Sequence, residues 1–119
     1  MSGENIKIYH NPRCTKSREA LHLLHEKGVD PIIEDYMKLG LETQELKTIL
    51  KKLGIKAVDL VRTNEPVYKL EYKDKADKMT EDDWIAAMIK EPKLMERPII
   101  IRGDKAIIAR PTENLLELL

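Results

Sequence analysis

The chain has 119 residues, enough for one domain with a single hydrophobic core but too few for two independent ones. Its 21 acidic and 21 basic residues cancel, which argues against broad electrostatic binding to nucleic acid or to an anionic membrane. One cysteine excludes an internal disulfide, and the sequence has no recognisable leader, apolar span or cluster of metal ligands. We therefore expect a cytoplasmic protein without a metal.

The first pattern along the chain is a strand followed by a helix. Apolar residues at 5–9 are typical of a short β-strand, and from Thr15 the apolar spacing becomes that of a helix, expected to end near Lys27. Cys14 lies between the two, after a polar turn. The cysteine should therefore sit at the carboxyl end of a strand and the start of a helix.

This position favours the charged form of the thiol. The first turn of a helix presents unpaired backbone N–H groups and the positive end of the helix dipole, and Arg13 and Lys16 are adjacent. A lone cysteine is more often a small buried apolar residue. Residues 10–18 are almost entirely polar or turn-forming, however, so we interpret Cys14 as a nucleophile with a lowered pKa.

A second strand is expected at 31–36. Strand, helix and strand within this short span form a βαβ unit, so the two strands should be parallel with a right-handed crossover. Ligands of open α/β sheets bind at the carboxyl ends of such strands, where Cys14 is expected.

The middle of the chain is predicted to be helical. A capping-box pattern that starts at Thr80 opens one helix, whose inward face should include Trp84, Ala87 and Met88. The expected elements are helices at about 42–53, 57–61 and 80–91, with a solvated connection at 64–78 that has room for one helical turn.

The last third predicts a β-hairpin. Strands at 98–102 and 105–109 are separated by Gly-Asp, a two-residue loop that suits a type II′ turn. The register then places Arg97 opposite Arg110. Two like charges in this position destabilise a hairpin unless an anion lies between them, so the pair is either an oxyanion clamp or two splayed, solvated side chains. Thr112 is expected to cap a final amphipathic helix.

Residues 10–18, His-Asn-Pro-Arg-Cys-Thr-Lys-Ser-Arg, resemble the active-site loop of the glutaredoxin-coupled arsenate reductases, the ArsC-like family. Later segments extend the likeness over nearly the whole chain. The resemblance implies an α/β, thioredoxin-like fold, with a mixed four-stranded sheet made of a parallel βαβ unit and a C-terminal antiparallel hairpin. It also implies one domain over 1–119 with a helical insertion at about 40–95.

The resemblance assigns roles to distant residues. The family's nucleophilic cysteine faces three arginines, and the positions that look like them here are Arg62, Arg97 and Arg110, which would bind the oxyanion. Guanidinium groups bind such oxygens with paired hydrogen bonds. Pro98 resembles the structural cis-proline of thioredoxin folds, so the Arg97–Pro98 peptide would be cis.

Two loop residues are candidates for support of the thiolate. His10 would help to hold it, as in the family, and its alternative role is a hydrogen bond within the turn. Ser17, one helical turn after Cys14, could donate a hydrogen bond to the sulfur or could satisfy only the backbone.

The absence of a second cysteine determines the source of electrons. A Cys-x-x-Cys enzyme would need cysteine at position 11, which is Asn11. The reductant must therefore be external, and the family's solution is glutathione as co-substrate followed by glutaredoxin as protein partner, with no bound cofactor. We expect a monomer that acts on arsenate.

Two other functions stay open. One is a glutathione-dependent thiol or disulfide reductase with little arsenate activity. The other is a regulator that resembles the Spx proteins and binds RNA polymerase, which the missing Cys-x-x-Cys motif disfavours.

Overall fold

The structure, a computed structural model, describes residues 5–119 and contains two compact units. The sheet unit comprises the chain up to Leu39 together with Arg97–Leu119, and the helical unit comprises Gly40–Glu96. A single domain with a helical insertion at about 40–95 stays a prediction.

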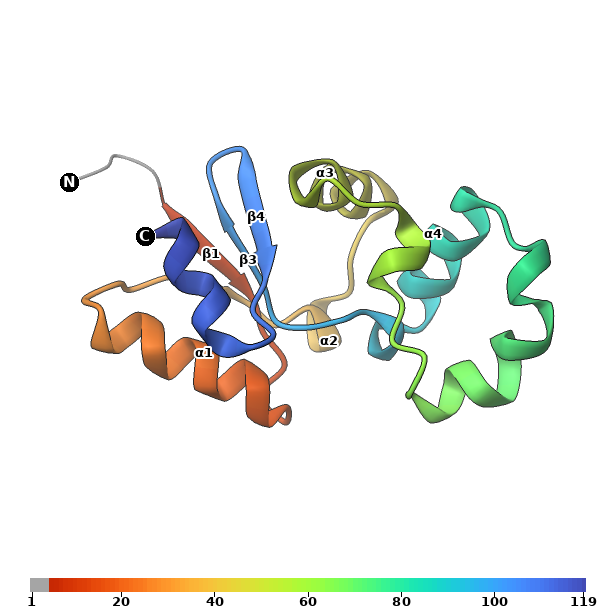
Figure 1. Cartoon of the computed structure of the whole chain (residues 1–119), viewed down its shortest axis with the longest axis horizontal. Helices are drawn as coiled ribbons and strands as arrows, with labels where there is room; N and C mark the ends of the chain where they lie inside the picture. Colours follow the sequence, from red (N-terminus) through yellow and green to blue (C-terminus); the bar gives the residue numbers. More distant parts are fainter. Residues whose placement is uncertain (1–4) are drawn as a thin grey trace. The chain divides into compact units, whose positions relative to one another are not determined.

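The sheet unit is built on four strands in the spatial order β2-β1-β3-β4 (Figure 1). β1 is parallel to β2 and antiparallel to β3, and β3 is antiparallel to β4. This mixed sheet confirms the predicted fold class. The strands are β1 (Ile6–Tyr9), β2 (Ile32–Glu34), β3 (Ile99–Arg102) and β4 (Lys105–Ile108).

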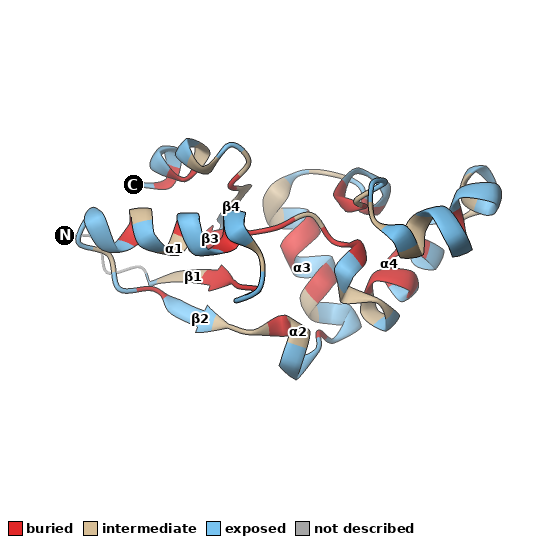
Figure 2. Cartoon of the chain, turned by 90° about the horizontal axis from the view of Figure 1, so that it is seen from below, coloured by how far each residue is buried: buried red, intermediate tan, exposed pale blue. Residues whose placement is uncertain are grey.

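Two helices cover one face of this sheet. They are α1 (Thr15–Glu26), which connects β1 to β2, and η5 (Thr112–Leu118), a 3₁₀ helix, and the two lie beside each other in Figure 1. Apolar side chains from both helices pack on the sheet, while β2 is mostly exposed at its edge (Figure 2). The buried cluster consists of Ile8, Ala20, Leu24, Ile100, Ala109, Leu115 and Leu118.

The C-terminal hairpin has the predicted register. Arg102 pairs with Lys105 and Ile99 with Ile108, so the arithmetic based on a two-residue loop is confirmed. Gly103 has φ of +62° and Asp104 has no positive φ, which matches a type II′ turn.

The second strand is shorter than predicted. β2 ends at Glu34, and Tyr36 begins the short helix α2 (Tyr36–Leu39). The cause is Asp35, whose side-chain oxygen accepts a hydrogen bond from the Lys38 N–H at 3.2 Å and so favours a helical turn over an extended backbone.

The final helix also differs from the prediction. It is a 3₁₀ helix in which Thr112 is the first residue, and Pro111 occupies the cap position. The Thr112 hydroxyl does not cap the helix but donates to the Glu19 carboxylate on α1 at 3.2 Å.

The helical unit contains the predicted helices, with α4 opening as the sequence indicates. The Thr80 hydroxyl accepts from the Asp83 N–H at 3.2 Å, and the Asp83 carboxylate accepts from the Thr80 N–H at 3.0 Å. Trp84, Ala87 and Met88 are buried, as predicted. The elements are α3 (Thr43–Leu53), η1 (Ala57–Leu60), α4 (Glu81–Lys90) and η4 (Pro92–Leu94).

The connection predicted at 64–78 is mostly exposed, as expected, but its second half contains more helix than the single turn that the sequence allowed for. Residues Tyr68–Tyr72 form one turn of π-helix, η2, and Lys73–Lys78 form the 3₁₀ helix η3. Tyr72 is 7% exposed, and its ring lies 6.1 Å from the ring of Trp84. The many charged residues of this segment gave no indication of the contact between the Tyr72 and Trp84 rings.

Candidate active site

Cys14 is the N-cap residue of α1, in the extended backbone conformation with φ of −93° and ψ of 122°. The loop before it is held by its own hydrogen bonds. The Cys14 N–H donates to the Asn11 carbonyl at 2.9 Å, and the Asn11 side-chain oxygen accepts from the Arg13 N–H at 3.0 Å. The Arg18 guanidinium donates to the Pro12 carbonyl at 2.9 Å. Hydrogen bonds within the loop thus fix the position of Cys14 at the carboxyl end of β1.

Two guanidinium groups meet the thiol at the open end of the hairpin. Nη2 of Arg110 lies 3.9 Å from Sγ of Cys14, and the Arg97 side chain forms a hydrogen bond with the same sulfur. Nε of Arg110 also donates to the Arg97 carbonyl at 2.7 Å, which couples the two residues. Arg97 is 9% exposed, so its charge lies in a largely desolvated position. The two arginines face the cysteine and are not splayed into solvent.

The pKa of the Cys14 thiol lies below its ordinary value, in the predicted direction. Burial alone would raise the pKa of this group. The Ser17 backbone N–H, the hydrogen bond and charge of Arg97, and the Lys16 backbone N–H together outweigh that effect. The helix N-terminus contributes as predicted, and the cation that lowers the pKa is Arg97, from a distant part of the chain.

Ser17 acts on the sulfur through its backbone N–H, while its hydroxyl bonds to the backbone, which is the second of the two roles that the sequence left open. Its Oγ accepts from the Asn11 N–H at 3.0 Å and shares a 2.6 Å hydrogen bond with Nδ1 of His10. His10, Asn11 and Ser17 are all buried. The hydroxyl therefore joins the end of β1 to the first turn of α1, which holds the Ser17 N–H beneath the sulfur.

Burial lowers the pKa of His10 below that of a free imidazole. Asp35 raises the pKa and Arg18 lowers it, and burial dominates. The ring is therefore neutral at neutral pH and forms hydrogen bonds without adding a positive charge.

Arg62 lies in the helical unit and is held by two carboxylates. Its Nε is 3.2 Å from Glu96 Oε1 and its Nη1 is 3.7 Å from Glu65 Oε2. The Arg62 backbone N–H donates to the Leu94 carbonyl at 2.7 Å. Its convergence on Cys14 stays a prediction.

The Arg97–Pro98 peptide is cis, as the resemblance implies. Arg110–Pro111 is also cis, which the sequence did not predict.

Sequence reasoning missed one residue at this site. Nδ2 of Asn114 donates to the Arg110 carbonyl at 3.1 Å and so fixes the backbone of a clamp arginine. The sequence could have indicated this contact, because Asn114 carries an amide side chain four residues after Arg110, at the start of a predicted helix.

Within residues 5–119 no group of three His, Cys, Asp or Glu side chains is placed to hold a metal ion. No helix of this described part of the chain is long and apolar enough to cross a membrane.

Comparison with known proteins identifies the family. The family model "ArsC family" matches residues 9–118. The chain is 46% identical over 116 residues to a Haemophilus influenzae protein named arsenate reductase, covering 97% of this chain and 99% of that one. It is 44% identical over 117 residues to the uncharacterized protein YfgD of Escherichia coli, covering 97% of each. Among solved structures, an arsenate reductase from Vibrio cholerae superimposes with a TM-score of 0.92 at 37% identity, covering 99% of this chain and 100% of that one. The chain belongs to the ArsC family.

Proposed function

We propose that this protein reduces arsenate to arsenite through a thiolate–arsenic adduct on Cys14, which is resolved by glutathione and glutaredoxin. The observation that carries the proposal is the approach of Arg97 and Arg110 to a thiol of lowered pKa. A relative named arsenate reductase, which is 46% identical over 116 residues, supports the same substrate.

The site suits a tetrahedral oxyanion. Two guanidinium groups supply paired, charge-assisted hydrogen bonds, and the N-terminus of α1 adds backbone N–H donors and a favourable dipole. These groups would bind the arsenate oxygens and draw charge from arsenic, which favours attack by the nearby sulfur. A disulfide substrate has less need for two converging cations.

The first step forms one bond and breaks one. The Cys14 thiolate attacks arsenic, a sulfur–arsenic bond forms, and one arsenate oxygen leaves as water after taking up protons. Arsenic is still As(V) in this adduct. Arg97 and Arg110 would hold the oxygens that remain.

The reducing electrons come from outside the chain because Cys14 is its only cysteine. One glutathione thiol resolves the adduct, and glutaredoxin completes the reduction and release. In total, two thiols become one disulfide, As(V) becomes As(III), and one oxygen of arsenate leaves as water.

Arg62 is proposed as a third cation for the oxyanion, and Pro98 as the structural support of Arg97. His10 is proposed to act while neutral, by holding the loop through Ser17.

The test is arsenate-dependent oxidation of NADPH in an assay that couples glutathione, glutathione reductase and glutaredoxin. Wild type should turn over, and Cys14→Ser should abolish turnover while leaving the folded state intact by circular dichroism, because serine is a far weaker nucleophile. Omission of glutaredoxin should also stop turnover.

Three outcomes would contradict the proposal. Turnover in the absence of glutaredoxin would show that the reaction does not need this partner. A folded wild type that is inactive on arsenate but reduces glutathionylated or disulfide substrates would identify a thiol reductase. Inactivity on both, with specific co-purification of RNA polymerase, would favour the regulatory alternative.

A further inference from the structure

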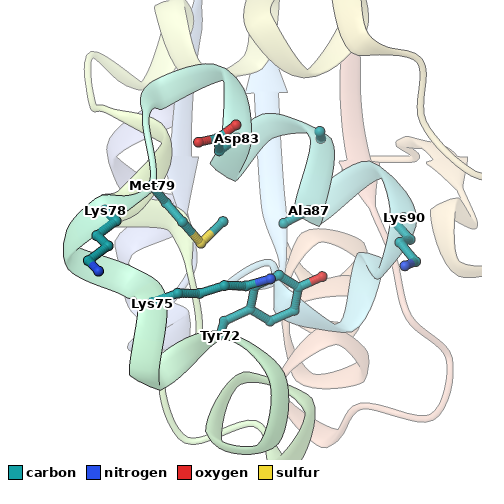
Figure 3. A pocket seen from close by; sticks show the side chains of 8 residues that line it. Tyr72, Lys75, Lys78, Met79, Asp83, Ala87 and Lys90 are labelled. Carbon is teal, nitrogen blue, oxygen red and sulfur yellow. The ribbon is translucent and has the colours of Figure 1, made fainter.

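The helical unit has a pocket that the proposed reaction does not use. It lies between η3 and α4 and has a volume of about 470 Å³, which is within the usual range for small-molecule sites (Figure 3). The lining residues are Tyr72, Lys75, Lys78, Met79, Asp83, Ala86, Ala87 and Lys90.

The charges around this pocket are strongly unequal. Lys75, Lys78 and Lys90 carry positive charge, whereas Asp83 is the only acidic lining residue. The Asp83 carboxylate already accepts the Thr80 N–H in the capping box. The chain as a whole has no net charge, so three ammonium groups around one pocket are a local concentration of positive charge.

Tyr72 adds a hydrogen-bond donor and an apolar wall. Like any tyrosine, it is protonated at neutral pH, and burial together with Glu71 and Glu91 raises the pKa of its hydroxyl further. The ammonium of Lys75 lies 5.1 Å from the centre of the Tyr72 ring, which places this cation over the ring. In Figure 3 the Met79 thioether points into the pocket beside them.

We propose that this pocket binds a small organic anion with at least two negative charges, whose apolar part packs on Met79 and Ala87 while its anionic groups contact Lys75, Lys78 and Lys90. The lining suits such a ligand because three of its four charged side chains are cationic donors and the rest of it, apart from the Tyr72 hydroxyl, is apolar. Carboxylate and phosphate groups share the required chemistry. The site is independent of arsenate reduction.

Isothermal titration calorimetry of the full chain tests this proposal. The probes are citrate, AMP and inorganic phosphate, and the fluorescence of Trp84 gives a second readout. Trp84 is the only tryptophan and lies against Tyr72, so a ligand in the pocket should change its emission. Saturable binding of citrate would indicate a carboxylate ligand, and binding of AMP a phosphate ester. Either supports the proposal, while binding of inorganic phosphate alone, or of no probe up to about 10 mM, overturns it.

Matched variants distinguish binding in the pocket from nonspecific attraction of the anion to surface lysines. Lys75→Gln, Lys78→Gln and Lys90→Gln combined should weaken binding about tenfold or more, since each lost charge-assisted hydrogen bond removes affinity. Ala86→Glu, at an exposed helical position of the lining, should weaken it by repulsion. The control combines Lys47→Gln, Lys51→Gln and Lys105→Gln, three exposed lysines outside the pocket, and should bind like wild type. Equal weakening in the control overturns the proposal.

Discussion

The sheet unit and the helical unit differ in what they bury. All four buried polar or charged residues of the described chain lie in the sheet unit, namely His10, Asn11, Ser17 and Arg97. In the helical unit, the buried residues among those described are apolar or aromatic. Removing polar groups from water is unfavourable unless hydrogen bonds compensate, so this distribution has to be explained.

The explanation is the position of Cys14. The Arg97 side chain forms a hydrogen bond with the Cys14 sulfur. Ser17, His10 and Asn11 form the hydrogen-bonded network that holds the loop preceding Cys14. The sheet unit therefore carries desolvated polar groups where they surround the Cys14 thiol, whose pKa is lowered. The helical unit has no such thiol to surround, and its core consists of apolar and aromatic contacts.

The largest expected effect on stability is in that apolar core. Trp84 is 3% exposed, and its ring lies 6.1 to 6.2 Å from the rings of Tyr72 and Tyr68. Trp84→Ala should lower the free energy of unfolding by about 3–5 kcal/mol, through lost burial and the cavity left behind. Urea unfolding followed by circular dichroism measures this. The control is Leu70→Ala, at a side chain that is 83% exposed, which should change stability by less than about 0.5 kcal/mol. A loss of under about 1 kcal/mol for Trp84→Ala would contradict the packing argument.

Arg97 should have the largest effect on chemistry. Arg97→Ala removes a donor to the sulfur and a cation from the proposed oxyanion site, so arsenate turnover should fall about 100-fold or more. The pKa of Cys14 should also rise, because the cation that lowers it is gone. The rate of thiol alkylation by iodoacetamide as a function of pH measures the second effect without arsenate.

Arg102→Ala is the matched control for this prediction. Arg102 stands at the opposite end of β3 from Arg97 and donates to the Leu118 carbonyl. Its loss should leave the alkylation profile in place. If both variants shift the profile equally, the clamp does not explain the lowered pKa of the thiol.

Much of the sheet unit could be predicted from sequence because its signals are local. The Gly-Asp turn fixed the register of the hairpin, and that register placed Arg97 across from Arg110. The prediction that the two arginines converge on Cys14 came from family resemblance, because no spacing rule relates residues 97 and 110 to residue 14.

The failures of prediction came where tertiary contacts override local composition. Residues 68–78 are rich in charge and suggested a solvated connection with at most one helical turn, whereas they form two successive helical segments in which Tyr72 packs against Trp84. The sequence also left open whether the Ser17 hydroxyl contacts the sulfur or only satisfies the backbone. Its choice of partners depends on where β1 ends relative to α1, which the sequence pattern does not encode.

Ser17→Ala distinguishes the role of the Ser17 hydroxyl from that of the Ser17 backbone N–H. The substitution removes the partner of two buried groups, His10 Nδ1 and the Asn11 N–H, and should cost about 1–3 kcal/mol of stability. The backbone N–H of residue 17 remains, so the pKa of Cys14 should shift less than in Arg97→Ala. Chemical unfolding and pH-dependent alkylation provide the two measurements. A shift as large as that of Arg97→Ala would restore the hydroxyl as a direct support of the thiolate.

The smallest expected effect is the dependence of stability on His10 protonation. Burial, assisted by Arg18 and opposed by Asp35, lowers the pKa of His10 in the folded chain, so the unfolded chain binds this proton more readily. The contribution is therefore fully present above the unfolded pKa of about 6.5 and is lost as the pH falls toward the lowered value.

Urea unfolding at a series of pH values, for wild type and His10→Asn, isolates this contribution as a difference between two curves. Wild type should lose more stability than the variant on acidification below about pH 6.5. Parallel curves for wild type and His10→Asn would mean that His10 is not held neutral by the fold. The proposal that His10 acts while neutral, by holding the loop through Ser17, would then lose its support.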